Sequence, residues 1–322
     1  MKKILVRAPD DQESVILSFS FMHALKEEYP QDQIYIIASE QAYDLYSLLP
    51  FKVFLHLFPL NKNNLPGIHH YAYNLNEVFN IDIYFDLIDD FKSTFMGFAF
   101  RAKERMGPDE GLKKYFLTKR FSPKVYSSCD LRSMDLLMSF TQKDFSQYKI
   151  FCSKLAYLKG IIRPYLLLLI DDYVLDEEKR KLLLLFLNSF ERQKFIFWNH
   201  EDDHYEKAQV RANFYSTLVS NNANNNEYEF LKSTNYEHLS QLILASKAVF
   251  SDQNWKVQLG AYYAKDAYFW GEKKLLASPY FKFSPSTLVM NNDKVSVYSG
   301  ESEQSFETVD ALVDYLHTTL VL

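Results

Sequence analysis

The chain has 322 residues, of which 48% are hydrophobic and 24% are charged, and its formal net charge is -5. This length predicts two domains, and the apolar fraction is large enough for two hydrophobic cores. The acidic balance and the lack of a recognisable nucleic-acid-binding module argue against nucleic acid as a partner. Cys129 and Cys152 are too few thiols for a disulfide framework, so a reducing compartment is expected.

The apolar runs of the chain are too short for a secretory signal or a membrane span. Its basic start is followed by only a brief apolar run before Asp10. The longest aliphatic runs, at residues 166–170 and 182–187, are far shorter than the roughly 18 residues that a span needs. A cytoplasmic protein is expected, and peripheral contact with the inner membrane stays open.

Short apolar runs alternate with longer amphipathic ones, which is the pattern of parallel sheets covered by helices. In the first half, strands are predicted at residues 3–7, 33–38, 53–58 and 81–87, with helices between them and a helical region at 130–158. Gly160 and Pro164 then predict a linker, because both residues interrupt regular structure.

A second set of strands and helices follows the linker. Strands are predicted at 165–170, 194–198, 248–251 and 267–270, helices at 176–191, 204–219, 236–245 and 307–316, and a polar loop at 221–226. The expected fold class is α/β, with two Rossmann-like domains facing a cleft. The first domain is predicted to cover residues 1–160 and the second to cover residues 161–322.

The first predicted strand runs into a helix through a turn that carries three carboxylates, Asp10, Asp11 and Glu13. In open α/β sheets such turns lie beyond the carboxyl ends of the strands, where ligands bind. The turn lacks the glycines with which a phosphate-binding loop exposes its N–H groups. It therefore predicts an acidic site or, in the simpler alternative, a helix N-terminus capped by these carboxylates.

Three segments together resemble one known family. They are ILVRAP with the turn and the helix ending in HALKEEYP, the stretch 91–121, and the stretch 238–271. In residue sequence and in spacing along the chain, these segments are similar to glycosyltransferase family 9, which contains the lipopolysaccharide heptosyltransferases. The resemblance implies a two-domain glycosyltransferase B architecture and transfer of a heptose-like sugar from a nucleotide donor, such as ADP-heptose, to a lipopolysaccharide-type acceptor. It implies no metal ion or other cofactor.

The resemblance also implies a position for the catalytic base, where the family has Gly-Asp and this chain has Glu13 and Ser14. The transfer needs a base to take the proton of the attacking acceptor hydroxyl. A serine hydroxyl cannot do this near neutral pH without a partner, so Glu13 is the candidate base. The alternative is a catalytically inactive relative that binds carbohydrate or a partner protein.

Two further loops correspond to the donor-binding positions of the family. The first carries Asp171 and Asp172 in place of a phosphate-friendly loop. In the second, Trp255 replaces a glycine, which removes the close approach of backbone to ligand. Its polar side chains can still meet a phosphate or a sugar, and they are Asp252, Gln253, Asn254, Lys256 and Gln258.

Residues 92–124 contain nine basic side chains against three acidic ones, in a chain that is acidic overall. Such a patch attracts an anionic partner. For this family it is the expected place of contact with an anionic glycolipid acceptor or with the inner leaflet of the membrane. The candidate acceptor-binding residues are Lys92, Ser93, Arg101, Lys103 and Arg105. A solvated basic surface over core phenylalanines is the simpler alternative.

Residues 200–204 read His-Glu-Asp-Asp-His, the H-E-x-x-H pattern in which two histidines bind zinc and the glutamate acts as a base. His200 directly follows the run KFIFWN at residues 194–199, which contains the predicted strand, whereas a zinc protease places this histidine within a helix. A polar loop is therefore expected, no metal site is predicted, and a zinc metalloprotease built on His200, Glu201 and His204 is a remote alternative.

Overall fold

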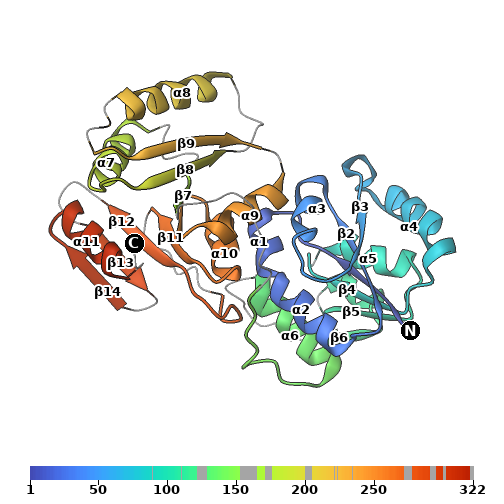
Figure 1. The fold of residues 1–322 in the computed structure, drawn as a ribbon. Helices are drawn as coiled ribbons and strands as arrows, with labels where there is room; N and C mark the ends of the chain where they lie inside the picture. Colours follow the sequence, from blue (N-terminus) through green and yellow to red (C-terminus); the bar gives the residue numbers. More distant parts are fainter. Residues whose placement is uncertain are drawn as a thin grey trace. The chain divides into compact units, whose positions relative to one another are not determined.

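A computed structural model gives the structure of the chain. It describes residues 1–88, 90–109, 111–121, 129–152, 165–170, 176–199, 205–220, 222, 224–233, 235–271, 278–290, 295–299 and 302–319. These residues divide into two compact units, Met1–Ile150 and Phe151–Leu322 (Figure 1). The division falls after residue 150 rather than after the predicted residue 160, and the predicted linker residues Gly160 and Pro164 lie outside the described part of the chain.

The first unit contains a six-stranded parallel sheet in the order β3-β2-β1-β4-β5-β6. Its strands are β1 (Lys3–Arg7), β2 (Gln33–Ala38), β3 (Phe54–Leu57), β4 (Ile83–Asp86), β5 (Glu104–Pro108) and β6 (Lys119–Phe121). Its helices are α1 (Gln12–Leu17), α2 (Phe19–Glu28), α3 (Glu40–Tyr46), α4 (Leu65–Phe79), α5 (Phe91–Ala99) and α6 (Cys129–Thr141), with the short 3-10 helices η1 (Leu60–Lys62) and η2 (Gly111–Tyr115). This strand order is that of a Rossmann fold.

The central strands of this sheet are apolar almost throughout because helices cover both of their faces. Strand β2 reads QIYIIA, and only Gln33 is not buried. Helix α4 packs beside α5, and α2 packs beside α6 (Figure 1). Helix α5 approaches β4 closely at Gly97, where an added Cβ atom would lie 2.3 Å from Cδ1 of Tyr84. A side chain at residue 97 would therefore push α5 away from the sheet.

The second unit contains an eight-stranded sheet in the order β14-β13-β12-β11-β10-β7-β8-β9. Its strands are β7 (Leu166–Leu169), β8 (Lys194–Asn199), β9 (Glu227–Lys232), β10 (Ala248–Ser251), β11 (Asp266–Trp270), β12 (Ser286–Met290), β13 (Val295–Ser299) and β14 (Ser302–Phe306). Its helices are α7 (Glu177–Asn188), α8 (Tyr205–Ser220), α9 (Tyr236–Ala245), α10 (Asn254–Tyr262) and α11 (Val309–Thr319).

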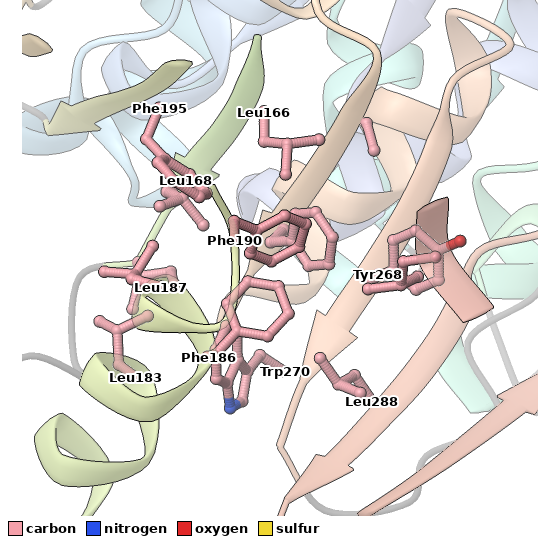
Figure 2. Packing of buried hydrophobic residues seen from close by; sticks show 14 of the residues in the cluster. Leu166, Leu168, Leu183, Phe186, Leu187, Phe190, Phe195, Tyr268, Trp270 and Leu288 are labelled. Carbon is pink, nitrogen blue, oxygen red and sulfur yellow. The ribbon is translucent and has the colours of Figure 1, made fainter. Parts of the chain in front are cut away.

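The parallel part of this sheet, from β9 to β12, repeats the Rossmann strand order of the first unit. Strands β13 and β14 extend it in antiparallel pairing. The core on one face joins Leu166 and Leu168 to Phe186 of α7, to Phe190 just after α7 and to Trp270 of β11 (Figure 2). The rings of Phe186 and Trp270 meet edge to face at 4.9 Å, a geometry that adds to the stability from burial alone.

The α/β class and the two Rossmann-like units predicted from the sequence are confirmed. The predicted strands 3–7, 33–38 and 248–251 and the predicted helix 236–245 coincide with β1, β2, β10 and α9. The helix predicted over 130–158 is wrong for residues 142–152, and its last residues, 153–158, lie outside the described part of the chain. Gln142 adopts the left-handed conformation, with φ of 57°, that commonly ends helices.

Candidate functional site

The strand order of the first sheet reverses between β1 and β4. Open α/β sheets bind ligands at such a point, beyond the carboxyl ends of the strands. Arg7 and Asp86 are register partners there, each at the last position of its strand. Both side chains are buried, at 5% and 3% exposure. A charged residue at the end of an apolar strand, as in KILVR and IYFD, is the sequence signal by which this pair can be found. The sequence predictions did not include Arg7 or Asp86.

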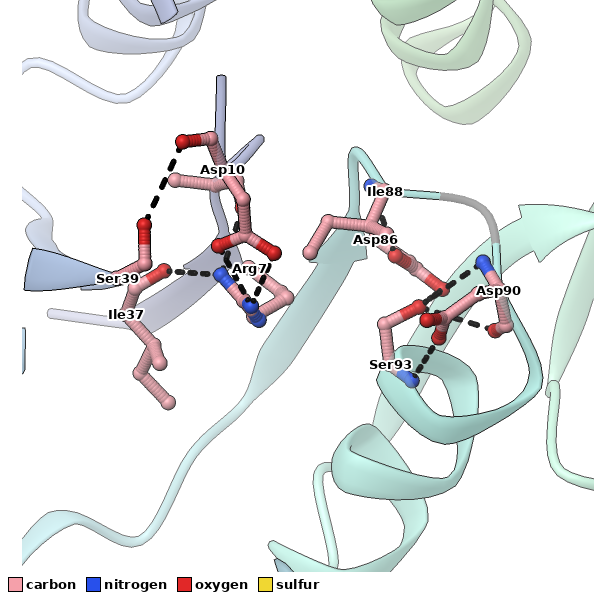
Figure 3. A network of polar contacts seen from close by, with 9 residues as sticks. Arg7, Asp10, Ile37, Ser39, Asp86, Ile88, Asp90 and Ser93 are labelled. Carbon is pink, nitrogen blue, oxygen red and sulfur yellow. Dashed lines mark hydrogen bonds and ion pairs between the residues drawn. The ribbon is translucent and has the colours of Figure 1, made fainter. Parts of the chain in front are cut away.

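The Arg7 guanidinium holds the turn that follows β1. Its Nη1 donates to the carbonyl oxygens of Ala8 at 2.7 Å and of Ile37 at 3.3 Å. Its Nη2 donates to both carboxylate oxygens of Asp10, at 3.0 and 3.1 Å (Figure 3). The Asp10 side chain is 51% exposed, so one end of this ion pair is buried and the other faces solvent. The pair fixes Asp10 above the end of β1.

The Asp86 carboxylate ties β4 to the first turn of α5. It accepts hydrogen bonds from Ser93 Oγ and Thr94 Oγ1, both at 2.8 Å, and from the Ile88 amide at 3.1 Å. Asp90 caps α5 and forms a reciprocal capping box with Ser93 (Figure 3). Ser93 was predicted to bind an acceptor, and the structure places its hydroxyl within this buried network.

The turn between β1 and α1 carries the predicted base. Asp11 caps α1 by accepting from the Ser14 amide at 2.8 Å, as the capping alternative predicted for it. Glu13 lies in the first turn of α1 and is exposed, and Ser14 is half-buried beside it. The structure therefore brings Asp10, Glu13 and Ser14 together at the carboxyl edge of the first sheet.

Helix α6 also begins at this edge. Arg132 reaches the carbonyl oxygen of Leu87, just beyond β4, with a hydrogen bond of 2.5 Å. Burial raises the pKa of Cys129 to about 11, so its thiol is protonated near neutral pH and is a poor nucleophile. Arg132 was not predicted from the sequence, because the contact joins α6 to Leu87, a residue 45 positions earlier in the chain.

The five predicted acceptor-binding residues do not form one site. Lys92 lies in the first turn of α5, at the carboxyl edge, where its Nζ donates to the carbonyl oxygen of Asn63 at 3.0 Å. Lys103 lies at the opposite edge and pairs with Asp82, the residue before β4, at 2.6 Å. The hydrogen bond from Lys103 lowers the pKa of Asp82.

Arg101 and Arg105 belong with Lys103 rather than with Lys92. Arg105 is the second residue of β5, and it donates from Nε to Phe116 and from Nη1 to Ala102, each at 2.5 Å to a carbonyl oxygen. Burial lowers the pKa of Arg105. Arg101 is exposed and ends α5 in the left-handed conformation. Of the predicted set, Lys92 and Ser93 are therefore the residues at the carboxyl edge.

The strand order of the second sheet reverses between β7 and β10, where Leu169 and Ser251 are register partners. The Ser251 hydroxyl donates to the carbonyl oxygen of Leu169 at 2.8 Å and accepts from the Gln253 amide at 3.0 Å. These bonds fix the loop that leads from β10 into α10. Asp171 and Asp172, predicted to bind the donor, follow β7 but lie outside the described residues.

Helix α10 and the loop before it carry the remaining predicted donor residues. The Lys256 ammonium lies 5.3 Å from the ring centre of Trp198 and 5.5 Å from that of Trp255, which is cation–π distance. Trp255 donates from Nε1 to Gln253 Oε1 at 3.0 Å. Lys256 and Gln258 are both 1% exposed. Asp252, Gln253, Asn254, Lys256 and Gln258 thus gather on one loop and the first turns of one helix, with the Lys256 ammonium covered by aromatic rings.

No three His, Cys, Asp or Glu side chains within the described residues are placed to hold a metal ion. The pattern His200 to His204 lies outside the described residues. The helices that are described include none with both the length and the apolar character needed to cross a bilayer.

Comparison with known proteins finds matches among solved structures. No family model and no curated protein matches the chain. A glycosyl transferase of family 9 from Veillonella parvula DSM 2008 matches with a TM-score of 0.73 and 13% identity, over 99% of this chain and 97% of that one. The E. coli ADP-heptose lps heptosyltransferase II matches with a TM-score of 0.67 and 16% identity, over 100% and 99%.

The chain has the heptosyltransferase fold. A third structure, E. coli heptosyltransferase WaaC with ADP-2-deoxy-2-fluoro heptose, has a TM-score of 0.65 and 12% identity, over 98% of this chain and 99% of that one. The resemblance to glycosyltransferase family 9 noticed in the sequence is thus confirmed in the fold, over the whole length of the chain. Both carboxyl edges described above belong to this heptosyltransferase fold.

Proposed function

We propose that this chain is a glycosyltransferase that moves a heptose-like sugar from a nucleotide donor to a lipopolysaccharide-type acceptor. The observation that carries the proposal is the match in fold over nearly the full length of both chains with two heptosyltransferases and a family 9 glycosyltransferase. One of these heptosyltransferases is described with an ADP-heptose analogue. We infer the same class of donor for this chain.

The donor diphosphate is assigned to the loop after β10 and the start of α10. A departing diphosphate needs positive charge and N–H donors close to its oxygens. Lys256 offers an ammonium group, and the first turn of α10 offers backbone amides at the positive end of a helix dipole. Because the rings of Trp198 and Trp255 cover Lys256, donor binding displaces at least the Trp255 ring.

The acceptor is assigned to the carboxyl edge of the first sheet. The Asp10 carboxylate accepts hydrogen bonds from Arg7, and the Asp11 carboxylate accepts one from the Ser14 amide at the start of α1. Glu13 is exposed in the first turn of α1, where the helix dipole favours its charged form by about 0.3 to 1 kcal/mol. We assign the proton of the acceptor hydroxyl to Glu13, which stands at the position that the family resemblance gives to the base, and an acceptor phosphate to Lys92. The steps assigned to these residues use no metal ion.

Calorimetry with ADP and ADP-heptose, followed by a transfer assay, tests this function. The wild type is expected to bind both nucleotides and to release ADP on transfer. Lys256→Met is expected to weaken binding of ADP by about tenfold or more, since it removes a charge-assisted contact to phosphate. Lys194→Met is the matched control, because Lys194 lies at the start of β8, whereas Trp198, which contacts Lys256, lies near its end. This variant should bind ADP as the wild type does.

A catalytically inactive relative is the second candidate, and one observation favours it. Trp255 stands where family 9 enzymes have a glycine, and its ring covers Lys256. In that case the folded protein gives no heat with either nucleotide and forms no product. The same experiment therefore separates the two candidates.

A further inference from the structure

The Trp255 ring covers the cation that is assigned to the donor diphosphate. Trp255 is the second residue of α10, and its ring centre lies 5.5 Å from the Lys256 ammonium. The ring of Trp198 lies 5.3 Å from the same ammonium. Trp255 is 7% exposed and Lys256 is 1% exposed. A diphosphate therefore reaches Lys256 only after a side chain has moved, and the contacts that hold Trp255 decide how readily this happens.

Gln253 holds the indole N–H of Trp255. Gln253 directly precedes α10, and its side chain does not cap the helix. Instead, Gln253 Oε1 accepts a hydrogen bond from Trp255 Nε1 at 3.0 Å. The Gln253 amide donates to the Ser251 hydroxyl at 3.0 Å, which fixes its backbone to the end of β10. The indole has a single N–H donor, so the bond to Gln253 also fixes the direction in which the ring points.

Tyr236 holds the ring of Trp255 from a second element. Tyr236 is the first residue of α9 and is buried, and its ring meets that of Trp255 edge to face at 5.8 Å. Such ring pairs contribute stability beyond that of burial. Asn235 caps α9 with its side chain, so the turn that carries Tyr236 is itself fixed. Trp255 is therefore held at its N–H by Gln253 and at its ring by Tyr236.

The contacts that hold Trp255 are individually weak. A hydrogen bond between neutral groups changes an equilibrium by about fivefold, and a ring pair or a cation–π contact has an effect of similar size. A diphosphate forms charge-assisted hydrogen bonds with an ammonium group, and these are stronger. The closed ring is thus favoured in the free protein and can still be displaced. The apparent affinity for the ligand is then lowered in proportion to the open fraction.

We propose that Gln253 and Tyr236 form a latch that holds Trp255 closed over Lys256 and so limits access to the diphosphate site. The identity of the ligand rests on the proposed function, whereas the latch itself concerns only access to Lys256. Gln253, which the sequence predicted to bind the donor, opposes donor binding in this arrangement. Removing its side chain therefore tightens donor binding, which is the opposite of the effect expected for a contact residue.

Acetylation by a pulse of acetic anhydride, quantified by mass spectrometry of peptides, measures access to Lys256 without nucleotide. Lys256 of the wild type should react far more slowly than Lys181, whose side chain is 70% exposed. Gln253→Leu should raise the rate at Lys256 by about fivefold, and Trp255→Ala by about tenfold or more. Gln253→Glu keeps an oxygen acceptor for the indole N–H and should protect Lys256 as the wild type does. The rate at Lys181 should be the same in all four proteins.

Calorimetry with ADP measures the effect of the latch on donor binding. Gln253→Leu should bind ADP about fivefold more tightly than the wild type, because a larger fraction of its molecules is open. Unchanged acetylation of Lys256 in Gln253→Leu would overturn the latch, whether or not ADP binds. Weaker binding of ADP by Gln253→Leu would also overturn it and would make Gln253 a donor contact. Faster acetylation with no heat from ADP in any variant would support the latch and contradict the proposed function instead.

Discussion

Arg7 and Asp86 stand side by side at the ends of β1 and β4, and each anchors the segment that follows its strand. Arg7 holds the turn through Asp10, and Asp86 holds α5 through Ser93 and Thr94. The carboxyl edge of the first sheet is therefore fixed by bonds within the unit. A substrate that binds there meets a prearranged surface.

Removing Arg7 is expected to cost stability. Arg7→Met leaves the carbonyl oxygens of Ala8 and Ile37 without this donor and Asp10 without its ion pair, so the free energy of unfolding should fall by about 2 to 4 kcal/mol. Urea unfolding measures this change. Asp10→Asn is the control, and because the Asp10 carboxylate is 51% exposed it should cost less than about 1 kcal/mol. Equal losses in both variants would contradict this assignment.

Gly97→Ala is expected to disturb the contact between α5 and β4. The new Cβ atom would lie 2.3 Å from the ring of Tyr84, whose hydroxyl donates to the Ser93 carbonyl oxygen at 2.6 Å and so resists movement. Overpacking of this kind costs about 1 to 3 kcal/mol. At Gly107 an added Cβ meets only the flexible end of Leu117, at 3.1 Å. Gly107→Ala should therefore unfold at a higher urea concentration than Gly97→Ala.

His23 should make stability depend on pH. Burial lowers the pKa of His23 from 6.5 to about 4, so between these values the unfolded chain binds a proton that the folded chain does not. The contribution of His23 is complete above pH 6.5 and is lost as the pH falls towards 4. The expected loss between pH 7.5 and 4.5 is about 2 to 3 kcal/mol.

Urea unfolding at several pH values checks the His23 prediction, by comparing how the free energy of unfolding changes with pH in the wild type and in His23→Gln. The curve of His23→Gln should fall less steeply with decreasing pH than that of the wild type. Parallel curves for the wild type and His23→Gln would show that His23 does not contribute.

Donor binding is expected to change the fluorescence of Trp255. Its ring covers Lys256, so a nucleotide diphosphate that reaches the ammonium must move the ring. Addition of ADP should change the tryptophan emission of the wild type more than that of Trp255→Phe, in which Trp198 alone is left beside Lys256. Trp270→Phe, in the core of the same unit, should retain the change. An unchanged spectrum at ADP concentrations that give binding heat would place the donor elsewhere.

The sequence predicted the central strands well and the edges of the sheets poorly. Strands β1, β2 and β10 are apolar runs bounded by polar residues, so their limits can be read directly. Strands β5, β6, β9 and β14 were missed, since they carry charged or polar side chains and their strand character comes from pairing with a neighbour. Strands β12 and β13 were also missed.

The candidate site was predicted in part for a similar reason. Glu13 and Ser14 lie where the motif placed them, because the turn after the first strand is a local feature. Arg7 and Asp86 meet through strands that are far apart in the sequence, and their register cannot be read from either segment alone. Arg101 and Lys103 were grouped with Lys92 by sequence position, although α5 separates them.

A transfer assay that compares the wild type with Glu13→Gln decides whether this chain transfers a sugar with Glu13 as the base. The wild type is expected to move heptose from ADP-heptose to a lipopolysaccharide-type acceptor, and Glu13→Gln is expected to bind ADP as tightly but to form no product. Glu178→Gln, exposed in the first turn of α7, should transfer at the wild-type rate. Undiminished transfer by Glu13→Gln, or no ADP release by the wild type, would contradict the account.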